Sequence, residues 1–70
     1  MANISNKPIY RGSNKRLKEL AYKAEKKGFT VVRTTGSHFI FKNKETGETF
    51  AANHILNKLV GDRIEKEMGL

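Results

Sequence analysis

The stretch that decides the fold is FTVVRTTGSHFIFK, residues 29–42. Its two halves, FTVVR and HFIFK, are rich in β-branched and aromatic residues, which favour strands. Between them lies Thr34-Thr35-Gly36, which is typical of a three-residue hairpin loop with glycine where the backbone takes a positive φ. The pattern predicts an antiparallel hairpin in which Arg33 faces Ser37 across the loop.

A third strand follows the hairpin. The segment ETFAA, residues 48–52, nearly alternates in the manner of a half-buried strand. The turn before it, Lys44-Glu45-Thr46-Gly47, again closes on glycine and sets Asn43 opposite Glu48. The three segments therefore predict a meander of three antiparallel strands.

The residues before the hairpin have the spacing of an amphipathic helix. Ser13 can cap the amides at its start, and Gly28 supplies the left-handed residue that ends a helix. We expect this helix over residues 14–27. Its apolar side chains fall at i, i+3, i+4 and i+7, at Leu17, Leu20, Ala21 and Ala24.

The residues after the third strand predict a second helix between 55 and 68, with Gly69 as its stop. Gly61 interrupts it at a cost of ~1 kcal/mol relative to alanine, so the start is left open from Ile55 to Asp62. The apolar stripe of this helix is Leu56, Leu59, Val60, Ile64 and Met68.

These elements give an α+β fold of order α-β-β-β-α, in which two helices pack on one face of a three-stranded antiparallel sheet. The first hairpin register pairs Val31 with Phe39, and the second pairs Phe41 with Phe50. We expect this domain over residues 14–70, after a flexible extension over residues 1–13. Both registers put the same side chains under the helices: Phe29, Val31, Phe39, Phe41, Phe50 and Ala52. The open face would carry Thr30, Val32, His38, Ile40, Lys42, Thr49, Ala51 and Asn53.

Composition limits the kinds of function. The chain has 70 residues, with 14 Lys and Arg against 7 Asp and Glu, so its net charge is +7. This excess favours a polyanion such as nucleic acid over an acidic protein or an anionic membrane.

No cysteine is present, which excludes disulfides, a thiolate zinc site and a cysteine nucleophile. No apolar stretch approaches the ~20 residues of a membrane span, and residues 1–13 lack the apolar core of a signal peptide. We expect a soluble cytoplasmic protein.

The candidate chemistry rests on the two histidines of the chain. His38 should be exposed on the open face, opposite Asn53 and beside His54, and a one-residue slip of the second hairpin would set the histidines opposite each other. Imidazole can take the proton of an RNA 2′-hydroxyl, whose oxygen then attacks the adjacent phosphorus without a metal. His54, Lys42 or Arg33 could protonate the leaving oxygen or hold developing charge. A surface histidine at a strand start is more often an ordinary polar residue or a turn partner than a catalyst, and His54 can equally be a residue that leads into the second helix. Two histidines without cysteine or a nearby aspartate make a weak metal site, so no metal or cofactor is expected.

Two further groups of side chains could contact nucleic acid. Tyr10 and Arg11 in the extension could touch a base and a phosphate, or the extension could simply pack its aromatic ring loosely on the domain. The lysines of the first predicted helix could bind phosphates, or they could form a solvated face. These are Lys15, Lys18, Lys23, Lys26 and Lys27.

The stretch KGFTVVRTTGSHFIFKN, residues 27–43, resembles the central motif of the HicA toxin family of mRNA interferases. That motif has Gly-Phe, a short strand ending near arginine, and Gly-Ser-His followed by apolar residues. This chain has Gly28-Phe29, Arg33 and Gly36-Ser37-His38-Phe39-Ile40 in the same order. The resemblance extends over roughly residues 14–70.

The resemblance implies a fold like that of a double-stranded-RNA-binding domain, with RNA cleavage by the histidine of Gly-Ser-His, here His38. It also implies a HicB-like antitoxin partner that covers this histidine. Ser37 beside it is then a candidate catalytic or phosphate contact. We expect a monomer when the antitoxin is absent. Two alternatives stay open: a nucleic-acid-binding module without catalysis, and an interaction protein whose open sheet face docks a protein partner.

Overall fold

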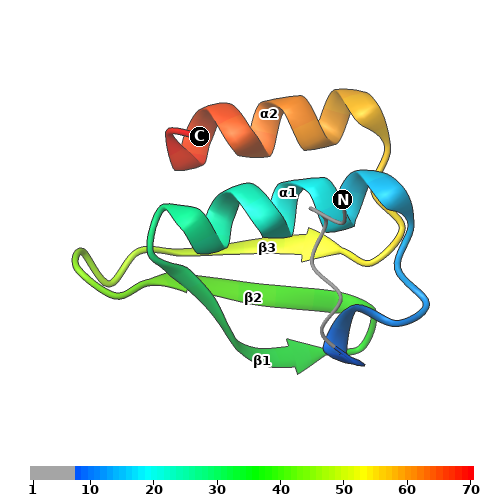
Figure 1. The fold of residues 1–70 in the computed structure, drawn as a ribbon, viewed down its shortest axis with the longest axis horizontal. Helices are drawn as coiled ribbons and strands as arrows, with labels where there is room; N and C mark the ends of the chain where they lie inside the picture. The colour runs from blue at the N-terminus through cyan, green and yellow to red at the C-terminus, as the bar shows by residue number, and fades with distance from the viewer. Residues whose placement is uncertain (1–7) are drawn as a thin grey trace.

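The computed structural model describes residues 8–70. The elements are a short 3-10 helix η1 (Pro8–Tyr10), helix α1 (Lys15–Lys26), strands β1 (Phe29–Thr35), β2 (His38–Asn43) and β3 (Thr49–Asn53), and helix α2 (Lys58–Met68). The strands form one antiparallel sheet in the order β1-β2-β3. Both helices lie over the same face of this sheet (Figure 1). The predicted α+β fold and the order α-β-β-β-α are therefore confirmed.

Helix α1 begins at Lys15, one residue later than predicted. Asn14, not Ser13, caps it, since its side-chain oxygen accepts a hydrogen bond from the Leu17 amide at 3.0 Å. The same oxygen accepts from the Leu56 amide at 3.2 Å, and the Asn14 amide group donates to the Leu56 carbonyl at 2.7 Å. One asparagine thus caps α1 and ties it to the chain that leads into α2. The four predicted core positions are buried: Leu17, Leu20, Ala21 and Ala24.

The predicted register of the first hairpin is wrong. A two-residue loop, Gly36-Ser37, joins the pair Thr35 and His38, and Val31 lies opposite Phe41 rather than Phe39. Gly36 has a φ of +58°, and glycine at the first position of a two-residue loop suits a tight hairpin turn. The alternation of apolar residues did not distinguish the two registers, because both keep Phe39 and Phe41 on the face under the helices.

A β-bulge between Val31 and Arg33 accompanies this register. The extra residue changes the side of the sheet on which the later residues of β1 lie. Arg33 now pairs with Ile40, on the face that the helices leave open. The bulge therefore brings Arg33 to the same face as His38.

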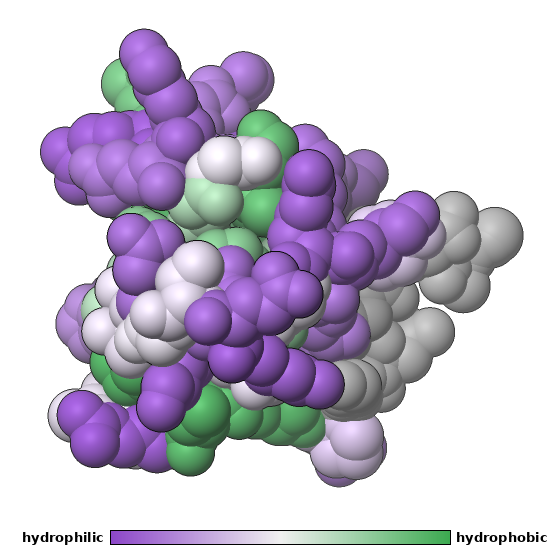
Figure 2. All heavy atoms as spheres, turned by 90° about the vertical axis from the view of Figure 1, so that its left-hand side faces the viewer, coloured by the Kyte–Doolittle hydropathy of each residue, from purple (hydrophilic) through white to green (hydrophobic). Residues whose placement is uncertain are grey.

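The second hairpin has the predicted register. Phe41 lies opposite Phe50, and His38 lies opposite Asn53. The side-chain oxygen of Asn43 accepts from the amides of Glu45 at 2.7 Å and Thr46 at 3.2 Å, which closes the turn. Val32, the residue of β1 that the bulge leaves unpaired, is 52% exposed. Figure 2 shows hydrophobic side chains along the lower edge of the molecule, on the side of the sheet away from the helices.

Helix α2 starts at Lys58 after its cap Asn57, whose side chain accepts from the Val60 amide at 2.8 Å. The prediction that Leu59 belongs to the apolar stripe of this helix is wrong, because its side chain is 81% exposed. The buried positions are Gly61, Ile64 and Met68, and a residue two positions before Gly61 faces away from that stripe.

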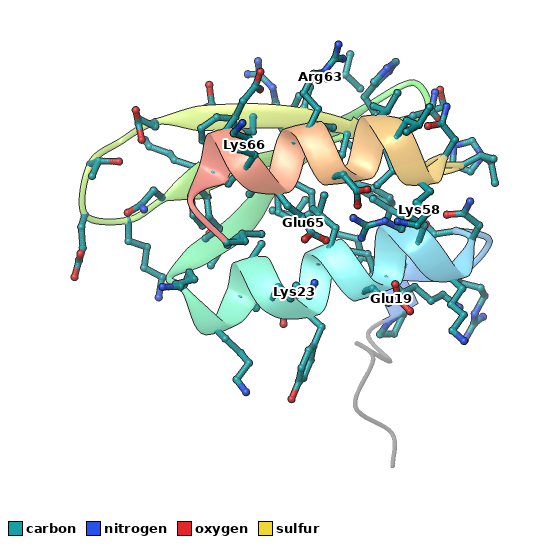
Figure 3. All side chains as sticks on the ribbon, turned by 90° about the horizontal axis from the view of Figure 1, so that it is seen from above. Glu19, Lys23, Lys58, Arg63, Glu65 and Lys66 are labelled. Atoms are coloured by element: carbon teal, nitrogen blue, oxygen red, sulfur yellow. The ribbon has the colours of Figure 1, made fainter. Side chains whose placement is uncertain are left out.

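Gly61 lets the two helices approach closely. A Cβ at this position would stand 2.7 Å from the Arg16 Nε, so the guanidinium would have to shift from its present position. Arg16 lies across α2 and contacts Asp62 at 2.9 Å and Glu65 at 2.6 Å, and Lys23 contacts Glu65 at 3.1 Å. Figure 3 shows Lys23 and Glu65 facing each other between the helices. An ion-pair network therefore joins α1 to α2.

The core also includes a residue that the sequence interpretation assigned to the flexible extension. Tyr10 is 1% exposed, and its ring packs edge to face on Phe39 with centroids 5.5 Å apart. Its hydroxyl donates to Glu25 at 2.9 Å. Residues 8–13 thus pack on the domain, because the aromatic ring of Tyr10 is buried there. The rest of the predicted flexible extension, residues 1–7, lies outside the described residues.

Candidate active site

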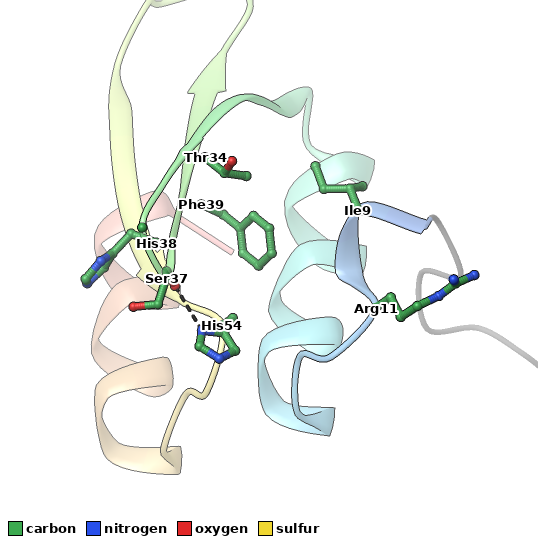
Figure 4. Close-up of a pocket in the computed structure, with 8 residues that line it drawn as sticks. Ile9, Arg11, Thr34, Ser37, His38, Phe39 and His54 are labelled. Carbon is green, nitrogen blue, oxygen red and sulfur yellow. Dashed lines mark hydrogen bonds between the residues drawn. The ribbon is translucent and has the colours of Figure 1, made fainter.

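His38 is the first residue of the central strand. It lies opposite Thr35 on β1 and Asn53 on β3, directly after the Gly36-Ser37 turn, and its side chain is exposed. Side chains alternate along a strand, so His38 points to the opposite side of β2 from the buried Phe39. Figure 4 shows this divergence directly.

His54 lies at the same end of the sheet but is held differently. Its backbone amide donates to the Ser37 carbonyl at 2.8 Å, and its ring Nδ1 lies 3.2 Å from the same oxygen. When Nδ1 carries the proton, Nε2 is left as an acceptor. Figure 4 shows His54 below Ser37, on the side of Phe39, while His38 points the other way. The two histidines therefore share one end of the sheet without facing each other.

Two hollows flank His38, which lines both of them. The first, here called the N-terminal hollow, has a volume of about 380 Å³. The second, here called the α2 hollow, has a volume of about 410 Å³. The N-terminal hollow is lined by Ile9, Arg11, Thr34, Gly36, Ser37, His38, Phe39 and His54. The α2 hollow is lined by His38, Ala51, Asn53, Ile55, Leu56, Asn57, Val60, Arg63, Ile64 and Glu67.

The α2 hollow adds a cation that sequence reasoning missed. Arg63 lines it together with His38, and Glu67 lies one helical turn further along α2. Figure 3 shows Arg63 projecting from α2 on the side away from α1. The available signal was the spacing of Val60, Arg63 and Glu67 at i, i+3 and i+7, which places all three along one side of the helix.

The structure separates the cations proposed to support His38. Arg33 lies opposite Ile40, which is the next residue after His38 on the open face of β2. Lys42 pairs with Thr30 and Thr49, four residues along β2 from His38. At the rise of a strand this is roughly 13 Å, too far for the same phosphate group. Arg33 is thus closer than Lys42 to His38 along the sheet.

The lysines of α1 lie in different surroundings. Lys23 contacts Glu65, and the Lys26 ammonium lies 5.1 Å above the centre of the Tyr22 ring. Lys23, Lys26 and Lys27 are near the end of α1, which Figure 1 places away from the β1–β2 turn. Lys15 and Lys18 lie in the first turns of α1, at the same end of the molecule as that turn.

Burial and ion pairing shift the pKa values of Tyr10, Asp62 and Glu65. Burial raises the pKa of Tyr10 well above its usual value, and the hydrogen bond and negative charge of Glu25 add to this. Burial alone would raise the pKa of Glu65, but the hydrogen bonds from Arg16 and Lys23 outweigh it and leave the pKa below its usual value. The hydrogen bonds from Arg16 and Lys58 lower the pKa of Asp62. These groups hold the fold together.

Within residues 8–70, no group of three or more His, Cys, Asp or Glu side chains is placed to hold a metal ion. No helix in the described part of the chain is long and apolar enough to cross a membrane.

Comparison with known proteins gives one match. Neither a search of curated proteins nor a search of solved structures found a similar protein. Residues 17–70 match the family described as the HicA toxin of bacterial toxin-antitoxin. This match spans both helices and all three strands, apart from the first two residues of α1. The chain therefore belongs to the HicA toxin family of bacterial toxin–antitoxin pairs.

Proposed function

We propose that this member of the HicA toxin family is a metal-independent endoribonuclease that cleaves mRNA with His38 as general base. The observation that carries the proposal is the position of His38. It is an exposed imidazole directly after a tight turn, between two hollows, on a chain of net charge +7. Imidazole is the side chain best suited to proton transfer near neutral pH.

In the proposed reaction His38 takes the proton of a ribose 2′-hydroxyl, and the 2′-oxygen attacks the adjacent phosphorus. The O2′–P bond forms while the P–O5′ bond breaks. The products are a 2′,3′-cyclic phosphate and a 5′-hydroxyl. The leaving 5′-oxygen takes up a proton from the imidazolium form of His54, whose Nδ1–H donates to the Ser37 carbonyl and whose Nε2–H is the proton transferred.

Cations around His38 would stabilise the charge that develops on the phosphate. Arg63 lines the α2 hollow together with His38, and Arg33 lies next along the open face. The exposed Ser37 hydroxyl, in the turn, could donate a hydrogen bond to a phosphate oxygen. Lys42 would contact the phosphate of a neighbouring nucleotide because of its distance along β2.

The α1 lysines would attract RNA to this end of the molecule to different degrees. Lys15 and Lys18 stand at the end of α1 near the β1–β2 turn and are proposed to bind phosphates. Lys23 is held by Glu65. Lys26 and Lys27, at the far end of α1, would contribute mainly to the long-range positive field.

The partner proposed for this toxin is a HicB-like antitoxin that covers His38. Support comes from the 52% exposed Val32, which directly precedes Arg33 in β1. Apolar area of this kind suits a protein partner better than RNA alone. With mRNA as substrate, the site of action would be the cytoplasm.

The test is the rate of RNA cleavage by the wild type and by His38→Ala, measured on one long RNA in the presence of EDTA. We expect the variant to lose at least a hundredfold in rate and to keep its fold, because His38 is exposed. Lys44→Ala is the matched control: it changes an exposed residue in the turn at the opposite end of the sheet. Undiminished cleavage by His38→Ala would overturn the assignment.

A binding module without catalysis is the second candidate. The different directions of His38 and His54 favour it, since no second imidazole faces His38. It predicts that the wild type binds RNA with a steep dependence on salt but produces no fragments.

A further inference from the structure

The N-terminal hollow has one wall outside the part of the chain that matches the family. Ile9 and Arg11 form this wall, and both precede residue 17, where the match begins. The opposite wall is the β1–β2 turn with Phe39 and His54. Figure 4 shows Ile9, Phe39 and His54 around the same space.

The N-terminal wall is firmly anchored. Tyr10 lies between Ile9 and Arg11, is 1% exposed, and packs edge to face on Phe39. Its hydroxyl bonds Glu25 on α1, and the Ser13 amide donates to the Tyr10 carbonyl at 3.0 Å. Ile9 is nevertheless 39% exposed. Burying Tyr10 therefore holds an aliphatic side chain at the edge of the hollow in contact with solvent.

The chemistry of the hollow fits a nucleobase. Ile9, which is 39% exposed, offers apolar surface for one face of a planar ring, and the Thr34 hydroxyl, which also lines the hollow, offers a group that bonds to its edge. The volume of about 380 Å³ leaves room for a single base. Arg11 stands at the rim, and Figure 4 shows its side chain extending outward, where it can meet a backbone phosphate.

The hollow is also in the right place relative to the proposed reaction. His38 lines both hollows, so RNA passing His38 meets the N-terminal hollow on one side and the α2 hollow on the other. A base bound beside Ile9 would lie next to the Gly36-Ser37 turn, which also lines the hollow, and His38 directly follows this turn.

We propose that the N-terminal hollow binds one unpaired nucleobase of single-stranded RNA beside the cleaved phosphate, so that residues 8–12 contribute to the choice of cleavage site. The effect on the choice of cleavage site rests on the proposed ribonuclease function. The binding of a base in the N-terminal hollow does not depend on that function.

Binding is tested in the full chain carrying His38→Ala, so that the RNA stays intact. A single-stranded RNA ten-mer is titrated against this protein with and without Ile9→Ser, and Leu59→Ser serves as the control. Leu59 is an exposed aliphatic residue that lines neither hollow. Loss of one stacking wall should weaken binding about tenfold, whereas Leu59→Ser should leave it unchanged. Arg11→Gln is a second variant and should reduce the slope of log affinity against log salt by about one.

Cleavage is tested with His38 present. Ile9→Ser should redistribute the cleavage sites on a long RNA, while Leu59→Ser should reproduce the wild-type pattern. Equal binding by the two serine variants, with identical cleavage sites, would overturn the proposal. If the wild type does not cleave RNA but binding still depends on Ile9, the base site stands and the ribonuclease assignment fails.

Discussion

The position of His38 depends on one glycine with a positive φ in the turn before it. Gly36 takes a φ of +58° in the two-residue loop, and a Cβ there would meet no atom within 4 Å. Backbone conformation alone therefore requires glycine at this position. The loop in turn places Ser37 and His38 at the tip of the central strand, where both side chains are exposed.

Replacement of this glycine should be costly. We expect Gly36→Ala to lower the free energy of unfolding by about 1–2 kcal/mol, because an L-residue is strained at this φ. Urea unfolding followed by circular dichroism measures it. Ser37→Ala, in the same turn but without a positive φ, should stay within about 0.5 kcal/mol of the wild type. Equal effects of the two substitutions would show that the turn does not impose this geometry.

At the scale of elements, the contact between the helices depends on a glycine that helix propensity disfavours. Gly61 makes room for Arg16, whose guanidinium reaches Asp62 and Glu65 on α2. The propensity cost of ~1 kcal/mol is thus offset by ion pairs between α1 and α2.

The coupling can be measured as a double-mutant cycle. Gly61→Ala should destabilise the wild-type protein, because the new methyl group displaces Arg16 from its two carboxylates. In an Arg16→Met background, where no guanidinium needs the space, the same substitution should stabilise by about 1 kcal/mol. An identical change in the free energy of unfolding in both backgrounds would mean that Gly61 and Arg16 are independent.

The strand registers and the start of α2 show which parts of the fold were predictable from the sequence. The β2–β3 register was predictable because the turn and the alternating pattern agreed on it. The β1–β2 register was not, since a bulge at Val32 absorbs one residue and leaves the apolar pattern intact. The exposure of His38 and its pairing with Asn53 followed from the second hairpin alone. The start of α2 was ambiguous because Gly61 looked like an interruption.

Two other features depend on tertiary contacts between segments that are far apart in the sequence. Tyr10 is a lone aromatic residue in a segment without helical or strand spacing, so its burial depends on tertiary contacts with Phe39 and Glu25. Arg63 joins His38 only because the edge of the sheet and α2 meet at the α2 hollow. Neither contact follows from local pattern.

At the scale of the whole molecule, stability should depend on acid pH through Glu65. Its pKa in the folded protein lies below the usual 4.5, because hydrogen bonds from Arg16 and Lys23 outweigh the opposing effect of burial. A carboxyl group with a depressed folded pKa stabilises the fold fully above its unfolded pKa. That contribution is lost as the pH falls through the folded value.

Thermal unfolding between pH 6 and pH 3 measures this dependence. The wild type should lose more stability over this interval than Glu65→Gln, which carries no titrating group at that position. The remaining slope of the variant should come in part from Asp62, whose pKa is also lowered. Parallel pH curves for the two proteins would contradict the role assigned to the network.

For the whole molecule, the central claim we propose is that this small basic member of the HicA toxin family cleaves RNA through His38 at the tip of its central strand. The most direct measurement is the chemical nature of the RNA ends produced by purified protein in EDTA, for the wild type and for His38→Ala. The account predicts 2′,3′-cyclic phosphate and 5′-hydroxyl ends from the wild type and no fragments from the variant. Fragments with 3′-hydroxyl and 5′-phosphate ends, or the same cyclic ends from His38→Ala, would contradict it.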